Sequence, residues 1–300
     1  TVSLGSLSGG SGTFLRGASS SDVATTFIIG GNNASTTFSG TITNGNTAVR
    51  SIAITKQGTG TLMLTGTNGY SGATTVDTGK LLVNGNQIFA TNTVTVNANG
   101  TLGGNGIIGG GTIVNGVLAP GTSIGKLSFN SHLTLNAASR SQFEISKNPF
   151  TNDQATVIGN VTFGGTLDAL NTSIEALEAG DNYQLFSAAN YLGAFANYEL
   201  PALDEGLAWN TSQLATNGRL WVVSTNPPVI NGYNLGGGSF TFSGTGGTPN
   251  WNYDILTTTN LALPVAQWSN VNSGQFDAAG AFNVLLPLDS ATAQRYYRLR

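Results

Sequence analysis

Residues 58–85 decide the fold class: they read Gly-Thr-Gly-Thr-Leu-Met-Leu-Thr-Gly-Thr-Asn-Gly-Tyr-Ser-Gly-Ala-Thr-Thr-Val-Asp-Thr-Gly-Lys-Leu-Leu-Val-Asn-Gly. Short runs in which apolar and polar residues alternate predict β-strands, and the glycine and Asn-Gly steps between them predict tight turns. The phrase Gly-Thr-Leu or Gly-Thr-Ile returns at 60–62, 100–102, 111–113 and 165–167. A repeated supersecondary phrase is typical of stacked coils, so we predict a solenoid built from strands of about three to five residues.

The solenoid is predicted to be a right-handed parallel β-helix over residues 1–226. In this prediction each coil takes about 20–25 residues, with Val, Leu and Ile stacked in inward ladders and Thr and Asn stacked outside. Glycine allows the sharp corners that other residues resist. One helical turn is expected at 173–179, where Ser-Ile-Glu-Ala-Leu-Glu-Ala precedes Gly180. The rest of the chain is predicted to be all-β.

A second domain is predicted at 227–300. Residues 225–228, Thr-Asn-Pro-Pro, indicate a linker, because two prolines hold the backbone extended and remove two hydrogen-bond donors. Beyond it the sequence gathers aromatic residues and longer alternating runs, at 239–243 and 282–286. These features predict a small antiparallel β-sandwich-like module with its own aromatic core.

Composition excludes several classes of protein. Charged residues make up 8% of the 300 residues and the net charge is −3, while 39% of residues are hydrophobic, so the chain can bury a core. The 42 glycines show no collagen period, and there is no cysteine for a disulfide or a thiolate metal site. No run reaches the roughly 18 apolar residues of a membrane span. Lys and Arg form no cluster, which argues against nucleic-acid binding.

The stretch at 58–85 resembles the autotransporter-associated β-strand repeat, which reads roughly G-x-G-T-L-x-L-x-G-x-N-x-Y-x-G-x-T-x-V-x-x-G-x-L-x-V/L. Matching positions fall in order: Tyr70, Gly72, Thr74, Val76, Gly79 and Leu81. Residues 38–42 and 54–57 are similar to the usual lead-in, and 227–300 is similar to a module that follows such repeats in large secreted bacterial proteins, including those of verrucomicrobia and planctomycetes. The resemblance implies a parallel β-helix, export from the cell and no known enzymatic role.

Few residues are candidates for catalytic chemistry. His132 is the single histidine, and no Gly-x-Ser-x-Gly elbow accompanies it, so a Ser-His-Asp triad is not expected. Paired carboxylates would be needed to cut polysaccharide, and we see no pair at matching positions on adjacent coils among the candidate acids Asp168, Glu175, Glu178, Asp181, Asp204 and Glu205. Calcium near Asp153 or Asp181 is the alternative for these acids. We expect no cofactor, and corner turns explain the glycines at 103–111.

Aromatic residues of the second domain present one binding hypothesis. Trp251, Trp268 and Tyr253, with Tyr233 nearby in sequence, could stack on sugar rings, although aromatic residues in so small a module are more often core.

We therefore expect a non-enzymatic, extracellular structural protein, a mature chain from which a signal peptide has been removed. Residues 1–150 carry a net +4 and residues 151–226 a net −7, which favours head-to-tail self-association into a filament or surface layer. The alternative is a surface adhesin that binds cell-surface glycan. A polysaccharide-active enzyme is the third hypothesis.

Overall fold

The computed structural model describes residues 1–17, 24–45, 50–288 and 294–300. The chain divides into two compact units. The first comprises Thr1–Glu175, Tyr183–Ala202 and Thr211–Leu220, and the second comprises Ala176–Asn182, Leu203–Asn210 and Trp221–Arg300. The domain boundary at 226/227 stays a prediction.

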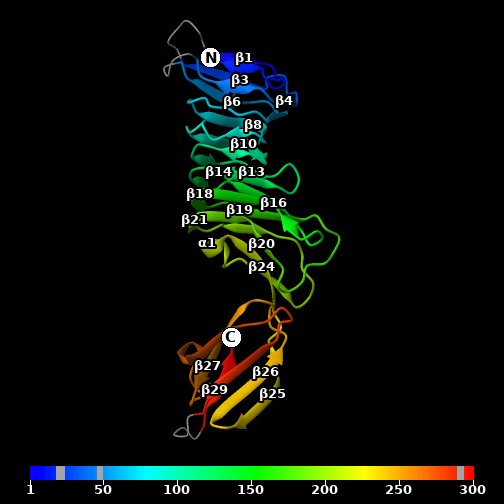
Figure 1. Cartoon of the computed structure of the whole chain (residues 1–300), viewed down its shortest axis with the longest axis vertical. Coiled ribbons are helices and arrows are strands. Elements are labelled where there is room, and N and C mark those ends of the chain that lie inside the picture. Colours follow the sequence, from blue (N-terminus) through cyan, green and yellow to red (C-terminus); the bar gives the residue numbers. More distant parts are fainter. Residues whose placement is uncertain (18–23, 46–49, 289–293) are drawn as a thin grey trace. The chain divides into compact units, whose positions relative to one another are not determined.

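Strands of the first unit stack in parallel as successive coils (Figure 1). Three ladders run through the stack, and we number them by their order within a coil. The first ladder consists of β1 (Val2–Leu4), β3 (Thr25–Ile29), β6 (Ile52–Lys56), the start of β8 (Thr74–Val83), the start of β10 (Val94–Gly104), β12 (Thr112–Val114), β15 (Leu133–Leu135), the end of β18 (Gln154–Phe163) and the end of β21 (Phe186–Gly193).

The second ladder contains β4 (Thr36–Phe38), β7 (Thr61–Leu64), the ends of β8 and β10, β13 (Val117–Pro120), β16 (Arg140–Ser146), β19 (Thr166–Asn171) and β22 (Asn197–Glu199). The third contains β2 (Phe14–Arg16), β5 (Thr41–Thr43), β9 (Asn86–Gln87), β11 (Ile107–Ile108), β14 (Lys126–Phe129) and the starts of β18 and β21. One short strand, β17 (Thr151–Asn152), pairs antiparallel with β16.

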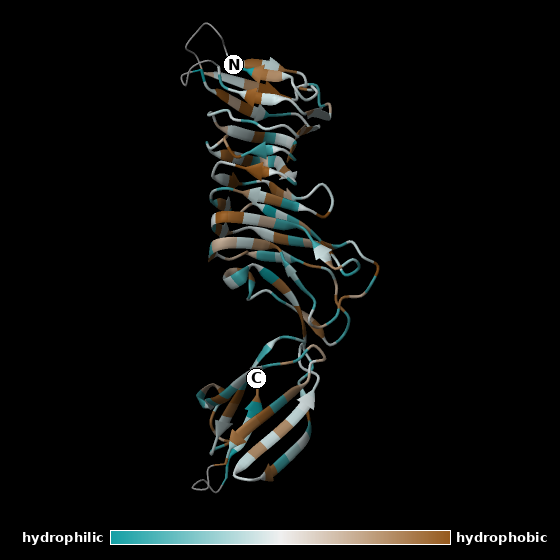
Figure 2. Ribbon diagram, in the orientation of Figure 1, coloured by the Kyte–Doolittle hydropathy of each residue, from teal (hydrophilic) through white to brown (hydrophobic). Residues whose placement is uncertain are grey.

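Inward ladders of aliphatic side chains form the core of the first unit, as predicted. In the first ladder, Val76, Val96, Val114 and Leu135 are each 2% exposed or less. Burying one such side chain contributes about 1.5–3 kcal/mol. Three of the four outward positions beside them are threonines, Thr75, Thr95 and Thr134, and the fourth is the exposed Ile113. Bands of apolar and polar residues alternate along the ribbon in Figure 2. The parallel stack of β-coils that the sequence predicts is therefore present.

Several strands are longer than predicted, because the chain stays extended through a corner. β8 has 10 residues and β10 has 11. Gly79 makes the corner within β8: its φ is +69°, and a Cβ there would lie 2.2 Å from the carbonyl oxygen of Gly58 in the preceding coil. Only glycine adopts this conformation without strain and leaves room for the neighbouring backbone.

The helical turn predicted at 173–179 is wrong. Residues 173–179 form a loop, and the α-helix of the chain's described part is the single turn α1 (Leu214–Asn217). Asn171 Oδ1 accepts the backbone N–H of Ser173 at 3.1 Å, which closes an Asx turn instead of a helix. A stretch of seven residues is also too short to nucleate a helix without tertiary support.

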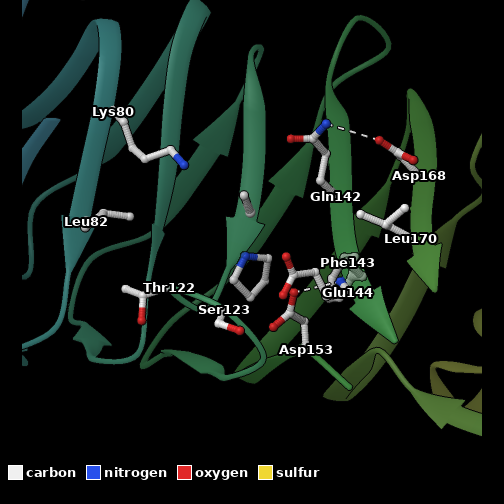
Figure 3. A pocket seen from close by; sticks show the side chains of 13 residues that line it. Lys80, Leu82, Thr122, Ser123, Gln142, Phe143, Glu144, Asp153, Asp168 and Leu170 are labelled. Atoms are coloured by element: carbon white, nitrogen blue, oxygen red, sulfur yellow. Dashed lines mark hydrogen bonds between the residues drawn. The ribbon is translucent and has the colours of Figure 1, made fainter. Parts of the chain in front are cut away.

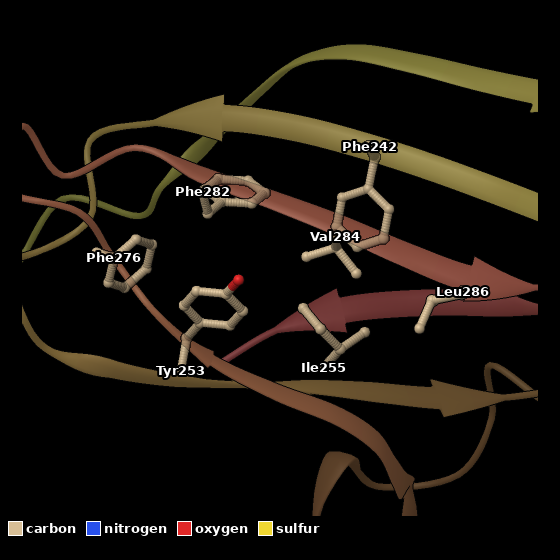
Figure 4. Packing of buried hydrophobic residues seen from close by; sticks show 7 residues of the cluster. All are labelled: Phe242, Tyr253, Ile255, Phe276, Phe282, Val284 and Leu286. Carbon is tan, nitrogen blue, oxygen red and sulfur yellow. The ribbon is translucent and has the colours of Figure 1, made fainter.

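The remaining strands pair in small sheets. β20 (Asn182–Gln184), β24 (Arg219–Ser224) and β23 (Leu207–Asn210) form one sheet. In the second unit, one antiparallel sheet has the order β25-β26-β29, with bounds Val229–Gly236, Ser239–Thr245 and Phe282–Pro287. The other has the order β28-β27-β30, with bounds Ser269–Gln275, Asn252–Thr258 and Tyr296–Leu299, and the short 3-10 helix η1 (Val265–Gln267) precedes β28. An apolar cluster drawn from both sheets fills the second unit (Figure 4): Phe242, Tyr253, Ile255, Phe276, Phe282, Val284 and Leu286.

Candidate functional site

A groove of about 280 Å³ lies in the first unit, over the second ladder (Figure 3). Strands β8, β13, β16 and β19 supply its walls, together with the turn at 121–123. Lys80, Gln142, Glu144 and Asp168 line it with polar groups. Leu170, 61% exposed, and Pro120 supply apolar surface beside them. The groove therefore offers charged, neutral polar and apolar contacts within one depression.

Asp153 is a buried carboxyl group in the lining of the groove. Its side chain is 2% exposed, and its two carboxylate oxygens accept backbone N–H groups of Gly125 at 2.8 Å and of Glu144 at 2.7 Å. Burial raises the pKa of Asp153 to about 7, and the nearby Glu144 carboxylate adds to the increase, while the two N–H donors oppose it. Figure 3 shows the Glu144 and Asp153 side chains next to each other.

A second group of charges crosses three coils beside the groove. Arg140 Nε donates to Asp168 Oδ2 at 3.0 Å, and its Nη1 donates to Glu199 Oε1 at 3.0 Å. Asp168 also accepts from Gln142 Nε2 at 3.1 Å. The Arg140 guanidinium lowers the pKa of Glu199. Asp168 and Glu199 are direct cross-strand partners, so Asp168 lies at a matching position to an acid on the adjacent coil that was not among the candidates.

The other candidate acids do not gather at this groove. Glu175 Oε1 accepts from Asn148 Nδ2 at 2.6 Å, and Asp181 Oδ2 accepts the backbone N–H of Glu178 at 2.8 Å. Four of the six belong to the second unit: Glu178, Asp181, Asp204 and Glu205. Within the described residues, no group of three or more His, Cys, Asp or Glu side chains is placed to hold a metal ion. The calcium suggested near Asp153 or Asp181 stays a prediction.

His132 is exposed and has a structural contact. Its Nδ1 accepts the backbone N–H of Asn160 at 3.0 Å, and this bond ties together the first-ladder turns of neighbouring coils. In a catalytic triad Nδ1 carries a proton and donates it to a carboxylate, whereas this Nδ1 accepts a backbone N–H.

The three aromatic residues suggested for sugar stacking lie in different settings. Tyr253 is 7% exposed, and its ring centroid is 4.8 Å from that of Phe276. Trp251 packs edge-on against Trp221 with the centroids 5.2 Å apart and lines a groove of about 310 Å³ in the second unit. Trp268 is half-buried and donates from Nε1 to the carbonyl of Leu263 at 3.0 Å. Among the described residues, no ring contact joins Trp268 to the other two.

Lys56 is a buried cation that the sequence-based analysis did not single out. It is 1% exposed and occupies an inward position of the first ladder, between Ile29 and Val76. Its Nζ donates to the carbonyls of Gln57 at 2.7 Å, Gly58 at 2.8 Å and Thr78 at 3.2 Å. Burial lowers the pKa of this ammonium. The lysine therefore ties the corner of its own coil to the corner of the next.

The residues of the motif at 58–85 occupy positions that a coil requires. Tyr70, 2% exposed, shares a 2.7 Å hydrogen bond with the hydroxyl of Thr74, and Asn68 is fully buried. A Cβ at Gly72 would lie 2.3 Å from the carbonyl oxygen of Ile52. The family model that matches residues 54–83 is the passenger-associated-transport repeat. Residues 54–83 of this chain therefore carry an autotransporter-associated repeat.

One protein that is similar to this chain is an adhesin, the BmaC autotransporter of Brucella suis biovar 1. The two are 43% identical over 67 residues, which make up 22% of this chain and 2% of the relative. The repeat protein therefore corresponds to a small part of that relative's length. It is secreted or located at the cell surface. In the part of the chain that the structure describes, no helix is both long and apolar enough to cross a membrane.

Proposed function

We propose that the repeat protein is a non-catalytic, extracellular passenger-type protein that acts by contact and associates with further copies of itself, end to end, through its coils. The observation that supports this most directly is the polarity of charge along the coils. The ladders follow the order of the sequence, from β1 to β22. Within the first unit, residues 1–150 therefore bring a net +4 to one end and the later residues a net −3 to the other.

Such a charge distribution favours head-to-tail contact between copies. Opposite ends attract and equal ends repel, which selects one orientation. A head-to-tail contact that does not close into a ring continues as a filament. Charged residues make up only 8% of the chain, so little general repulsion opposes the contact.

Analytical ultracentrifugation tests this proposal. At about 20 mM salt we expect species larger than the monomer that dissociate near 500 mM, where the Debye length falls to about 4 Å. The double variant Lys80→Glu with Lys126→Glu removes the positive charge of the first 150 residues through two exposed side chains and should abolish the association. Arg298→Glu, an exposed change in the second unit, is the matched control. A monomer at every concentration in low salt would refute the proposal.

Adhesion is the second candidate function. The named adhesin supports it, as does the groove of about 310 Å³ in the second unit that contains Trp251. We propose cell-surface glycan as the ligand, with Trp251 and Trp268 as stacking residues. A glycan array tests this with Trp251→Ala, and Trp221→Ala separates loss of ligand contact from loss of the ring packing. Binding that survives Trp251→Ala and Trp268→Ala would remove this proposal.

Three finer features of the fold belong to the proposal. We infer that the coils wind right-handed, because a right-twisted strand leads into the next parallel strand in that sense. The two antiparallel sheets of the second unit are proposed to be the layers of a β-sandwich, supported by the shared apolar cluster. Residues 227–300 are proposed to fold as a domain of their own, which expression of that fragment would test by a cooperative unfolding transition.

A further inference from the structure

Strand β25 is an edge strand with an open apolar surface. It is the outer strand in the order β25-β26-β29, and no other strand of the described chain pairs with its second edge. Four large apolar side chains on it are exposed: Val229 by 58%, Ile230 by 54%, Tyr233 by 76% and Leu235 by 60%. Both its backbone groups and its side chains are therefore available to a partner.

Two of these side chains continue the core face of the sheet. Directly opposed residues of an antiparallel pair point to the same face. One row runs Val284, Phe242, Tyr233, and exposure along it is 2%, 3% and 76%.

The second row is Leu286, Phe240, Leu235, and Leu286 at its inner end is 4% exposed. Figure 4 shows the inner members Phe242, Val284 and Leu286 within the cluster. The apolar face thus extends one strand beyond the part of the sheet that is covered.

β25 lacks two of the features that protect natural edges, a charge and a proline, although its pairing with β26 has an irregularity between Ile230 and Gly232. Edge strands are usually short, or carry a charge or a proline that prevents a further strand from pairing. β25 reads Val-Ile-Asn-Gly-Tyr-Asn-Leu-Gly: eight residues with no charge and no proline. The opposite edge, β29, ends in Pro287. An edge of this kind fits strand addition, in which main-chain hydrogen bonds hold the partner and alternate side chains pack against it.

We propose that β25 pairs antiparallel with β25 of a second copy of this chain. A two-fold contact of this kind brings together two strands of equal length, neither of which carries a charge, so no like charges are opposed. It also places Tyr233 of each copy opposite Leu235 of the other. The inference rests on the proposed self-association and adds to it a second contact that is apolar and insensitive to salt.

Cysteine crosslinking tests the geometry, because the natural chain contains no cysteine. Single variants Asn231→Cys, Asn234→Cys and Leu235→Cys are oxidised mildly, and the covalent dimer is measured. A two-fold antiparallel pair places one position closest to its own copy, so we expect a single maximum along the strand. Leu285→Cys on β29 is the matched control, since Leu285 is 63% exposed in the same sheet. Dimer yields no higher than that of Leu285→Cys would overturn the proposal.

A charge on the edge provides the second test. Sedimentation at about 500 mM salt removes the end-to-end contact, and dimers that remain should be lost in Leu235→Lys but kept in Leu285→Lys. Near-ultraviolet circular dichroism of each variant verifies that the second unit stays folded. A wild-type chain that associates only at low salt would overturn the β25 contact and leave the end-to-end proposal standing. Dimers that persist in Leu235→Lys at high salt would overturn it as well.

Discussion

Replacing Lys56 by methionine tests the role of the buried ammonium. Methionine has a similar unbranched stem, so the apolar contacts between Ile29 and Val76 are largely kept. What is lost is a donor to three carbonyl oxygens, two in the corner of the same coil and one in the next. We expect Lys56→Met to loosen these coils.

The magnitude follows from the balance of two effects. A hydrogen bond from a charged group contributes about 1.5–3 kcal/mol, so three of them contribute about 4.5–9 kcal/mol before the cost of burial. Removing the ammonium also recovers several kcal/mol of desolvation penalty. The expected net loss is about 2–3 kcal/mol in local stability, which corresponds to roughly 30- to 150-fold faster amide exchange where exchange proceeds by opening of these coils.

Hydrogen exchange read by mass spectrometry is the suitable assay, because coils can open without unfolding the whole chain. Peptides from residues 52–83 should lose protection, while peptides from residues 252–287 serve as the internal reference. Lys80→Met is the matched control: it removes the same charge from an exposed side chain one coil later and should change stability by less than about 0.5 kcal/mol. Exchange in Lys56→Met within threefold of that in Lys80→Met would refute the reasoning.

Three further predictions concern the coils. Burial raises the pKa of Asp153 from 3.8 to about 7, so between these two pH values the folded chain holds a proton that the unfolded chain releases. Stability at this site is therefore highest below about pH 4 and falls as the pH rises to about 7, by about 1.4 kcal/mol per pH unit at most. Asp153→Asn should abolish this slope in the hydrogen exchange of peptides 121–125 and 144–153. Arg140→Gln should return the pKa of Glu199 upward toward its usual value, measured by carboxyl NMR titration, and no movement would show that the ion pair does not persist in solution. Gly79→Ala should cost more than about 2 kcal/mol, because its Cβ would lie 2.2 Å from a carbonyl oxygen at positive φ, whereas Gly111→Ala meets nothing nearer than 3.8 Å and should be tolerated.

Only part of the candidate site could be predicted from the sequence. The Asn148-Pro149 step is a turn signal, and a hairpin around it places residue 144 opposite residue 153, so the Glu144–Asp153 pair had a local signal. Asp168 and Glu199 had none: they are partners across a coil boundary. Coils differ in length, with an offset of 18 residues between Val94 and Thr112 and of 30 between Val161 and Tyr191. Without a constant repeat length, sequence spacing does not predict which residues lie above one another.

The sequence by itself determined the class of structure. Alternating apolar residues, corner glycines and the repeated Gly-Thr-Leu phrase specify parallel coils with aliphatic ladders, because strands and turns depend on residues that are close together in the sequence. Only the tertiary structure decided that Lys56, in a position where its neighbours along the ladder are Ile29 and Val76, is buried and bonded to carbonyls of two coils. Likewise, the exposure of Tyr233 and Leu235 follows from β25 being an edge without a facing layer. Burial depends on what packs against a strand. The alternation of side chains along the strand is the same whether its inward face is covered, as at Lys56, or open, as at Tyr233 and Leu235.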